Sequence, residues 1–175
     1  LKAILFDLDG VLLEAKTIHF ESLNVALAEV GEEFQISETE HLSIYDGLNT
    51  TKKLEMLSER KGLDRKFYNQ IWHDKQTATF NLIRQIPKNN NLRQMFAQIQ
   101  SSGYKIAVAS NSIRETIKLA LLSIGVMEYV DYYVSNEDVF NPKPFPEMYW
   151  QCMTKLKALP KDTIIVEDSH IGREG

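Results

Sequence analysis

Three short apolar runs in this 175-residue chain each end in polar residues that could hold a metal ion or a phosphate group. Asp7-Leu8-Asp9 follows the first run, Ser110-Asn111 follows the second and Glu167-Asp168 follows the third. Residues two apart in extended chain point to the same side, so the carboxylates of Asp7 and Asp9 are expected to face one centre. Crowded carboxylates need a compensating cation. A hard, oxygen-seeking Mg²⁺ that keeps waters and a substrate phosphate suits them.

A positive charge for the same centre is expected from a proline-rich loop. Lys143 lies within Asn141-Pro142-Lys143-Pro144-Phe145-Pro146, where the prolines limit how far its ammonium can move. The hydroxyl of Ser110 and the backbone N–H groups that start the next helix add donors for a phosphate. In phosphoryl transfer one carboxylate attacks phosphorus, a second carboxyl protonates the leaving oxygen, and cations offset the charge of the transition state. Alone, Lys143 would be interpreted as a solvated loop residue, so the prediction depends on the convergence of the motifs.

The elements that must position these residues alternate between strands and helices. Apolar runs typical of buried strands cover 1–6, 104–109, 132–134 and 163–166. Helical spacing occurs between them, before Gly103, before Gly125 and from Pro146 to Leu156, and Ser112 with Glu115 has the spacing of a capping box. This alternation predicts a parallel sheet whose ligand lies beyond the carboxyl ends of its strands.

The block from Thr17 to Ile86 is predicted to be all helical. Its apolar residues recur at intervals of three and four, Ser37 and Glu40 form a possible capping box, and Pro87 ends the block. The block lies between the first strand and the remaining strands. The predicted fold is therefore α/β, a Rossmann-like parallel sheet core over 1–14 and 87–175 with an inserted all-helical cap domain over 15–86.

The composition narrows the classes of function. The chain has 20 Lys and Arg against 24 Asp and Glu, a net charge of −4, which disfavours a nucleic-acid-binding module. No apolar run approaches the roughly 18 residues of a membrane helix, and the single cysteine, Cys152, cannot form an internal disulfide. We expect a cytoplasmic protein with neither a nucleic-acid nor a membrane partner.

Four motifs together resemble those of the haloacid dehalogenase superfamily. In chain order they are Phe6-Asp7-Leu8-Asp9-Gly10-Val11-Leu12, Ala109-Ser110-Asn111-Ser112, Asn141-Pro142-Lys143-Pro144-Phe145-Pro146-Glu147 and Val166-Glu167-Asp168-Ser169. The chain is similar, more narrowly, to the branch with a helical cap after the first motif, which holds β-phosphoglucomutase and many sugar-phosphate phosphatases. It departs from the family pattern at Leu13-Glu14-Ala15, where the third position often carries a hydroxyl group.

The resemblance implies a role for each carboxylate. Asp7 is implied as the nucleophile and a Mg²⁺ ligand, and Asp9 as the general acid and base, with its backbone carbonyl on the metal. Asp168 is implied as a further metal ligand, supported by Glu167. Dehalogenases and phosphonate-cleaving relatives lack an aspartate at the position of Asp9, so the resemblance favours an ester oxygen as the leaving group.

The resemblance also implies residues that bind the substrate. Ser110 and Lys143 are implied to hold the transferring phosphate during catalysis, with Asn111 next to it. In the cap, Gly47 lies in a loop similar to the one that reaches toward the active site, and Lys75 resembles a lysine that contacts the substrate.

The predicted function is a Mg²⁺-dependent phosphatase that hydrolyses a small, sugar-like phosphomonoester through an aspartyl-phosphate at Asp7. One alternative is a β-phosphoglucomutase-like phosphosugar mutase. The mutase of the family carries an arginine just after the cap-loop glycine, whereas this chain has Thr50 in that region, and this favours hydrolysis. A second alternative is a regulatory or interaction domain of a longer fused protein, against which the intact catalytic set argues. The expected partner is a small phosphorylated metabolite.

Overall fold

The structure, a computed structural model, describes residues 1–45, 48 and 50–174, so the predicted site residue Gly47 lies outside the described residues. The chain divides into two compact units. The first consists of residues 1–15 and 84–175, and the second of residues 16–83. The roles of core and cap that the sequence suggests for such a division stay predictions.

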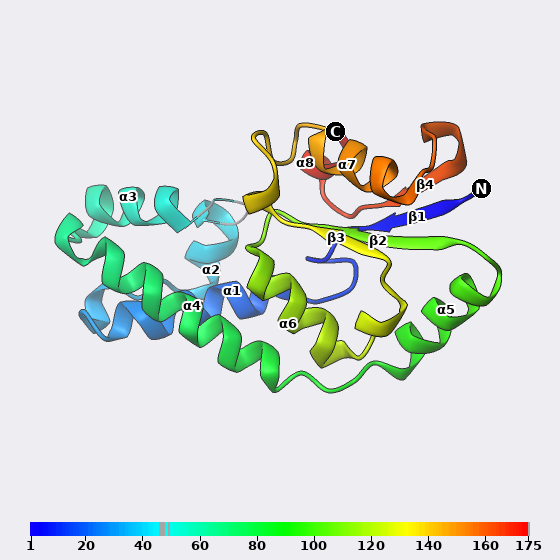
Figure 1. Ribbon diagram of the computed structural model, residues 1–175. Coiled ribbons are helices and arrows are strands. Elements are labelled where there is room, and N and C mark those ends of the chain that lie inside the picture. The colour runs from blue at the N-terminus through cyan, green and yellow to red at the C-terminus, as the bar shows by residue number, and fades with distance from the viewer. Residues whose placement is uncertain (46–47, 49, 175) are drawn as a thin grey trace. The chain divides into compact units, whose positions relative to one another are not determined.

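A four-stranded parallel sheet forms the centre of the first unit (Figure 1). Its strands are β1 (Ala3–Phe6), β2 (Lys105–Ala109), β3 (Tyr132–Val134) and β4 (Thr163–Val166), in the spatial order β3-β2-β1-β4. The register places Phe6 opposite Val108 on one side and Val166 on the other. The residues that follow β1, β2 and β4 therefore leave the sheet at the same edge. The predicted parallel sheet is confirmed.

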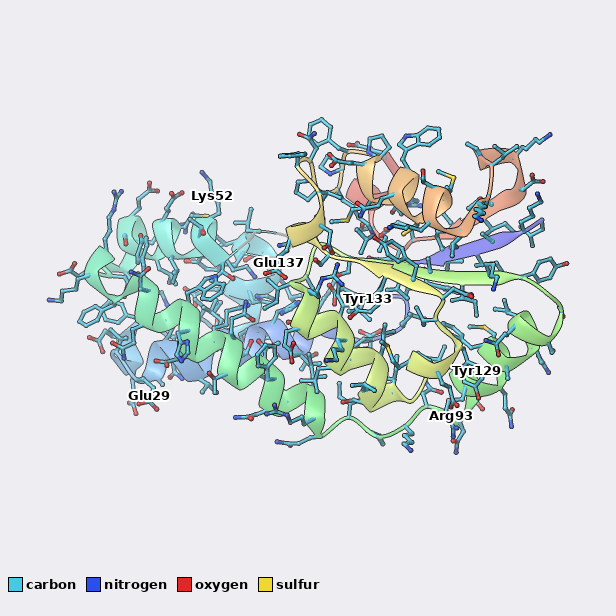
Figure 2. The ribbon with its side chains drawn as sticks, in the orientation of Figure 1. Glu29, Lys52, Arg93, Tyr129, Tyr133 and Glu137 are labelled. Carbon is cyan, nitrogen blue, oxygen red and sulfur yellow. The ribbon has the colours of Figure 1, made fainter. Side chains whose placement is uncertain are left out.

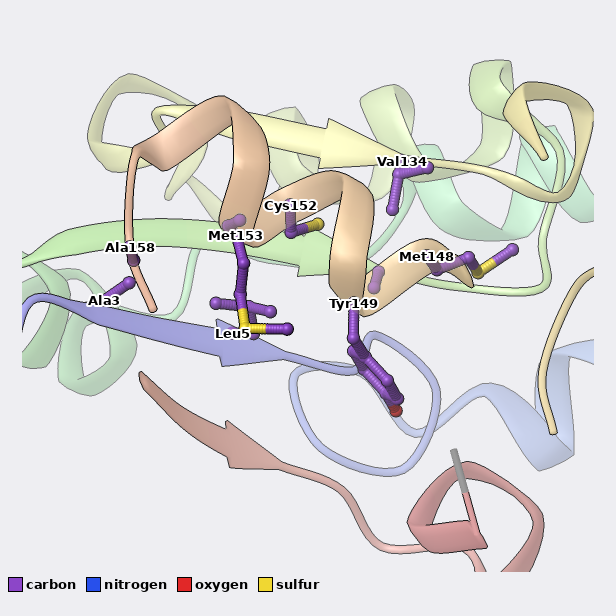
Figure 3. Close-up of a cluster of buried hydrophobic side chains, with 10 residues drawn as sticks. Ala3, Leu5, Val134, Met148, Tyr149, Cys152, Met153 and Ala158 are labelled. Atoms are coloured by element: carbon purple, nitrogen blue, oxygen red, sulfur yellow. The ribbon is translucent and has the colours of Figure 1, made fainter. Parts of the chain in front are cut away.

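Helices cover both faces of this sheet (Figure 1). The helices α5 (Asn90–Ser101) and α6 (Arg114–Ile124) lie on one face and α7 (Glu147–Leu156) on the other. On the α5 face, the rings of Phe6 and Phe96 stack with centroids 5.0 Å apart. On the other face, Met153 of α7 reaches Leu5 of β1, and Cys152 and Met148 belong to the same buried cluster (Figure 3). The remaining elements are short: η4 (Met127–Tyr129), η5 (Asn136–Asp138), η6 (Pro160–Asp162) and α8 (His170–Glu174).

The start of α6 differs from the sequence prediction. Ile113 stands at its N-cap and makes no side-chain capping bond, so the predicted capping box of Ser112 and Glu115 is wrong. The Ser112 hydroxyl instead donates to Asp9. The end of α6 is as expected, because Gly125 adopts the left-handed conformation, with φ of 80°, that closes helices.

In the part that the structure describes, the second unit contains helices and no strand, as predicted. In chain order its helices are α1 (Ala15–Ala28), η1 (Glu32–Phe34), α2 (Glu38–Glu40), η2 (His41–Tyr45), α3 (Thr50–Lys61), η3 (Arg65–Phe67) and α4 (Tyr68–Arg84). The first residue of α1 and the last residue of α4 belong to the first unit. The capping box of Ser37 and Glu40 is confirmed. A core that includes Leu23, Leu57 and Ile71 holds the unit together.

Charged side chains lie on the outside of the helical unit. Figure 2 shows Glu29 and Lys52 directed away from the helices. Lys52 pairs with Glu55 at 3.5 Å, and because both side chains are exposed the pair contributes little to stability. Among the residues that the structure describes, no helix combines the length and the apolar character needed to cross a membrane.

Candidate active site

The carboxyl ends of the strands bring together residues that are far apart in the sequence. Asp7 directly follows β1, and its backbone N–H donates to the Val166 carbonyl at 2.9 Å. Ser110 directly follows β2, and its N–H donates to the Val134 carbonyl at 3.2 Å. Both side chains are buried. The hydrogen bonds of the sheet thus continue into the site and fix the backbone of two predicted site residues.

Lys143 is buried between two carboxylates. Its Nζ lies 2.7 Å from Oδ1 of Asp7 and 2.7 Å from Oε2 of Glu167, and the residue is 8% exposed. Burial alone favours the neutral amine, but the neighbouring carboxylates, Asp7 first, overcome this and raise the pKa of Lys143. The lysine is therefore a fixed positive charge at the end of the sheet.

Hydrogen bonds hold the loop that carries Lys143. The Asn111 side chain donates through Nδ2 to the Lys143 carbonyl at 3.1 Å and accepts from the Lys143 N–H at 3.0 Å. Earlier in the loop, the backbone N–H groups of Phe140 and Asn141 donate to the Glu147 carboxylate at 2.9 and 2.8 Å. The amide of Asn111 therefore positions the lysine, and the closeness of Asn111 to a phosphate stays a prediction.

The two aspartates of the first motif have different surroundings. Burial raises the pKa of Asp7 to about 6, although the adjacent Lys143 opposes this. Burial also raises the pKa of Asp9, against the hydroxyls of Ser112 and Ser110, which donate to its Oδ2 at 3.2 and 3.4 Å. A carboxyl whose pKa is raised by burial holds its proton more readily, which suits a general acid.

Three carboxylates form a group that fits a metal ion. Asp7, Glu167 and Asp168 each offer an oxygen, and these oxygens lie within 4.8 Å of one another. Gly10, with φ of 87°, brings the backbone so close that a Cβ there would lie 2.1 Å from Oδ2 of Asp168. Such a compact set of hard oxygen donors suits Mg²⁺. The side chain of Asp9 is described by the structure but is not one of these three carboxylates.

Among the described residues, Ser112 and Tyr149 contact the site although the sequence did not assign them to it. Ser112 closes the Ser-Asn-Ser segment, and its hydroxyl donates to Asp9. Tyr149 lies one helical turn after Pro146, and its hydroxyl donates to Oε2 of Glu167 at 2.8 Å. For Tyr149, the available signal was an aromatic residue in the first turn of the helix that follows the lysine loop.

The predicted substrate lysine of the cap is buried in the second unit. Lys75 lies on α4 and is 7% exposed, and its contact with a substrate stays a prediction. Nearby, Nδ1 of His19 is shielded from solvent and has no hydrogen-bond partner among the described residues. Burial first, and then the charges of Lys75 and Lys53, lower the pKa of His19 to about 3.

Comparison with known proteins places these features in a wider group. Residues 4–175 match the family described as haloacid dehalogenase-like hydrolase. Over 177 residues, the chain is 25% identical to a phosphorylated carbohydrates phosphatase of Thermotoga maritima, an alignment that covers 99% of this chain and 79% of the relative.

Two solved structures share the fold. A hydrolase of the same family from Deinococcus radiodurans, crystallised with bound phosphate and sodium, has a TM-score of 0.74 at 25% identity, covering 99% of this chain and 75% of the other. A β-phosphoglucomutase from Clostridium difficile has a TM-score of 0.78 at 22% identity, covering 99% and 79%. These likenesses confirm the predicted α/β fold with a Rossmann-like core.

Proposed function

The chain belongs to the haloacid dehalogenase-like hydrolases, and from this premise we propose that it is a Mg²⁺-dependent phosphatase acting on a small, sugar-like phosphomonoester. The observation that carries the proposal is the buried ammonium of Lys143 at 2.7 Å from Asp7, the first residue after the central strand β1. A fixed cation beside a carboxylate is the arrangement that attack on a phosphate dianion requires. The phosphorylated carbohydrates phosphatase of T. maritima, with which the chain aligns over almost its full length, supports a sugar phosphate as the substrate.

The first step transfers the phosphoryl group to the protein. A carboxylate oxygen of Asp7 attacks phosphorus, and the bond from phosphorus to the ester oxygen breaks. Asp9 gives its proton to the leaving oxygen, and the burial that raises the pKa of Asp9 favours this protonated form. Lys143 and the Ser110 hydroxyl offset charge on the transferring oxygens. The product of this step is an aspartyl-phosphate at Asp7 and a free alcohol.

The second step restores the protein. The Asp9 carboxylate takes a proton from a water molecule as that water attacks phosphorus. The bond between phosphorus and Asp7 breaks, which releases inorganic phosphate and returns both aspartates to their starting states. Mg²⁺ would be held by Asp7, Glu167 and Asp168, where it supplies further neutralisation of the phosphate charge.

Phosphate release from a panel of small phosphomonoesters tests the proposal. Release is expected with Mg²⁺, and it is expected to fall to background with EDTA or in Asp7→Asn. The matched control is Asp162→Asn, in the η6 turn before β4 at the opposite end of the sheet, which is expected to keep wild-type activity. Absence of release across the panel would refute the proposal. So would conversion of a sugar 1-phosphate to its isomer without free phosphate when a sugar bisphosphate is supplied.

A further inference from the structure

Tyr149 lies behind the site, between the core of the first unit and the buried ion pair. It belongs to the first turn of α7 and is 2% exposed. Its ring packs within the apolar cluster on one face of the sheet. Figure 3 shows the ring leaving α7 and extending past the end of β1, with the hydroxyl at its far end. The Tyr149 side chain is therefore part of the core except for its hydroxyl group.

The Tyr149 hydroxyl contacts Glu167 directly. Its oxygen lies 2.8 Å from Oε2 of Glu167 and 3.1 Å from the Gly172 carbonyl oxygen. The hydroxyl has one proton, and the nearer, charged acceptor forms the stronger hydrogen bond. The face of the ring also lies 5.2 Å from Nζ of Lys143, a cation–π distance. Tyr149 thus contacts both partners of one buried ion pair.

Both oxygens of the Glu167 carboxylate accept hydrogen bonds. Oε2 accepts from Lys143 and Tyr149, and Oε1 accepts from the Ser169 hydroxyl at 2.8 Å. The backbone of α8 lies close to the carboxylate, because a Cβ on Gly172 would lie 2.0 Å from Cδ of Glu167. The side chain of Glu167 is 3% exposed. These contacts hold Glu167 in place, and Tyr149 of α7 supplies one of its hydrogen bonds.

We propose that Tyr149 is a positioning residue for this centre. Its hydroxyl fixes the Glu167 carboxylate, and Glu167 in turn holds the ammonium of Lys143 on Asp7. Glu167 is also one of the three carboxylates that fit a metal ion, so the same hydrogen bond orients the metal-binding group. Mutation of a residue that hydrogen-bonds to a metal ligand typically lowers metal affinity or activity by about 10- to 100-fold. The kinetic part of the proposal rests on the proposed function, whereas the metal-binding part does not.

The Tyr149→Phe variant tests the proposal because it keeps the ring and removes only the hydroxyl. Titration with Mg²⁺ alone by calorimetry is expected to show an affinity about tenfold weaker than that of the wild type. Phosphate release at saturating Mg²⁺ is expected to show a kcat reduced by about tenfold. The matched control is Tyr132→Phe, in β3. It removes a hydroxyl that accepts a hydrogen bond at 2.9 Å from Gln151, which lies on α7 like Tyr149. We expect the control to retain wild-type values in both measurements.

A double-mutant cycle tests whether Tyr149 acts through Glu167. In a Glu167→Gln background, Tyr149→Phe is expected to change kcat by less than about twofold, because residues in one network do not add. A full tenfold loss in that background would overturn the proposal, as would wild-type Mg²⁺ affinity in Tyr149→Phe. If the wild-type protein releases no phosphate from any ester, the proposed function fails. The Mg²⁺ titration alone then decides the role of Tyr149.

Discussion

Nζ of Lys143 lies 2.7 Å from Oδ1 of Asp7, although 136 positions separate the two residues in the chain. Asp7 is fixed by the sheet, and Lys143 is fixed by the bonds of Asn111 to its backbone. The pair is therefore held from both ends by the fold rather than by the flexibility of the lysine side chain. Each partner neutralises a charge that would be costly to bury alone.

Removal of the lysine should destabilise the protein. Lys143→Ala leaves two buried carboxylates without a cation, and we expect the free energy of unfolding in EDTA to fall by about 3–5 kcal/mol. Added Mg²⁺ should raise the melting temperature more in this variant than in the wild type, because the ion replaces the missing positive charge. Urea unfolding and thermal melts measure both effects. Lys155→Ala, at an exposed position of α7, serves as the control, and an equal loss there would contradict this account.

Gly10 should be intolerant of a side chain for two separable reasons. Gly10→Ala places a Cβ 2.1 Å from Oδ2 of Asp168 at a backbone φ of 87°. Gly103→Ala has nearly the same φ, 83°, with nothing within 4 Å of the new Cβ. Both variants should lose about 1–2 kcal/mol through the left-handed backbone. Only Gly10→Ala should also weaken Mg²⁺ binding, as calorimetry will show; equal Mg²⁺ affinities would argue against the contact with Asp168.

His19 should make the protein sensitive to acid. Its pKa in the folded protein is about 3, below the value near 6.5 of the unfolded chain, so the unfolded chain binds the proton first as the pH falls. Stability is therefore full above pH 6.5 and declines toward pH 3, by up to about 1.4 kcal/mol per pH unit. His19→Gln should flatten this slope in urea unfolding between pH 6.5 and 4.5. His73→Gln, at an exposed position, should keep the wild-type slope, and identical slopes for both variants would refute the assignment.

Asn111 should affect catalysis through the lysine loop. Asn111→Ala removes both hydrogen bonds to the Lys143 backbone, and we expect kcat/KM to fall by about tenfold, the equivalent of one such bond. Asn89→Ala is the matched control, since Asn89 accepts from Leu92 at the start of α5, on an element that carries no site residue. The control should lose stability but keep kcat/KM. Unchanged kinetics in Asn111→Ala would mean that the prolines alone hold the loop.

The sequence predicted the elements of the first unit well because its strands are short, apolar and clearly bounded. The strands over 132–134 and 163–166 have the predicted limits, and α7 ends at the predicted Leu156. The meeting of Asp7 with Ser110 and Asp168 at one edge followed from parallel pairing alone. In a parallel sheet, residues that directly follow neighbouring strands lie close together in space at the carboxyl edge.

The contacts that the sequence did not predict come from competition between local and distant partners. Ser112 has the spacing of a helix cap, but its hydroxyl donates a hydrogen bond to Asp9, which lies 103 positions earlier in the chain. Tyr149 has the spacing of a core residue and is one, yet its hydroxyl reaches Glu167. Helical periodicity describes which face of a helix is buried. It does not describe where the far end of a long side chain finishes.

The central place of β1 in the sheet has a consequence for protein synthesis. β1 lies between β2 and β4, so a nascent chain leaving the ribosome carries β1 without either neighbour until residues 105–109 are made. At about 5–20 residues per second, that interval lasts roughly 5–20 s. The helical unit is translated during this wait, and the buried residues of its described core cluster lie between Leu23 and Ile71. Asp7 waits still longer for Lys143, so its carboxylate lacks the cation that neutralises it in the folded protein until residue 143 has been made.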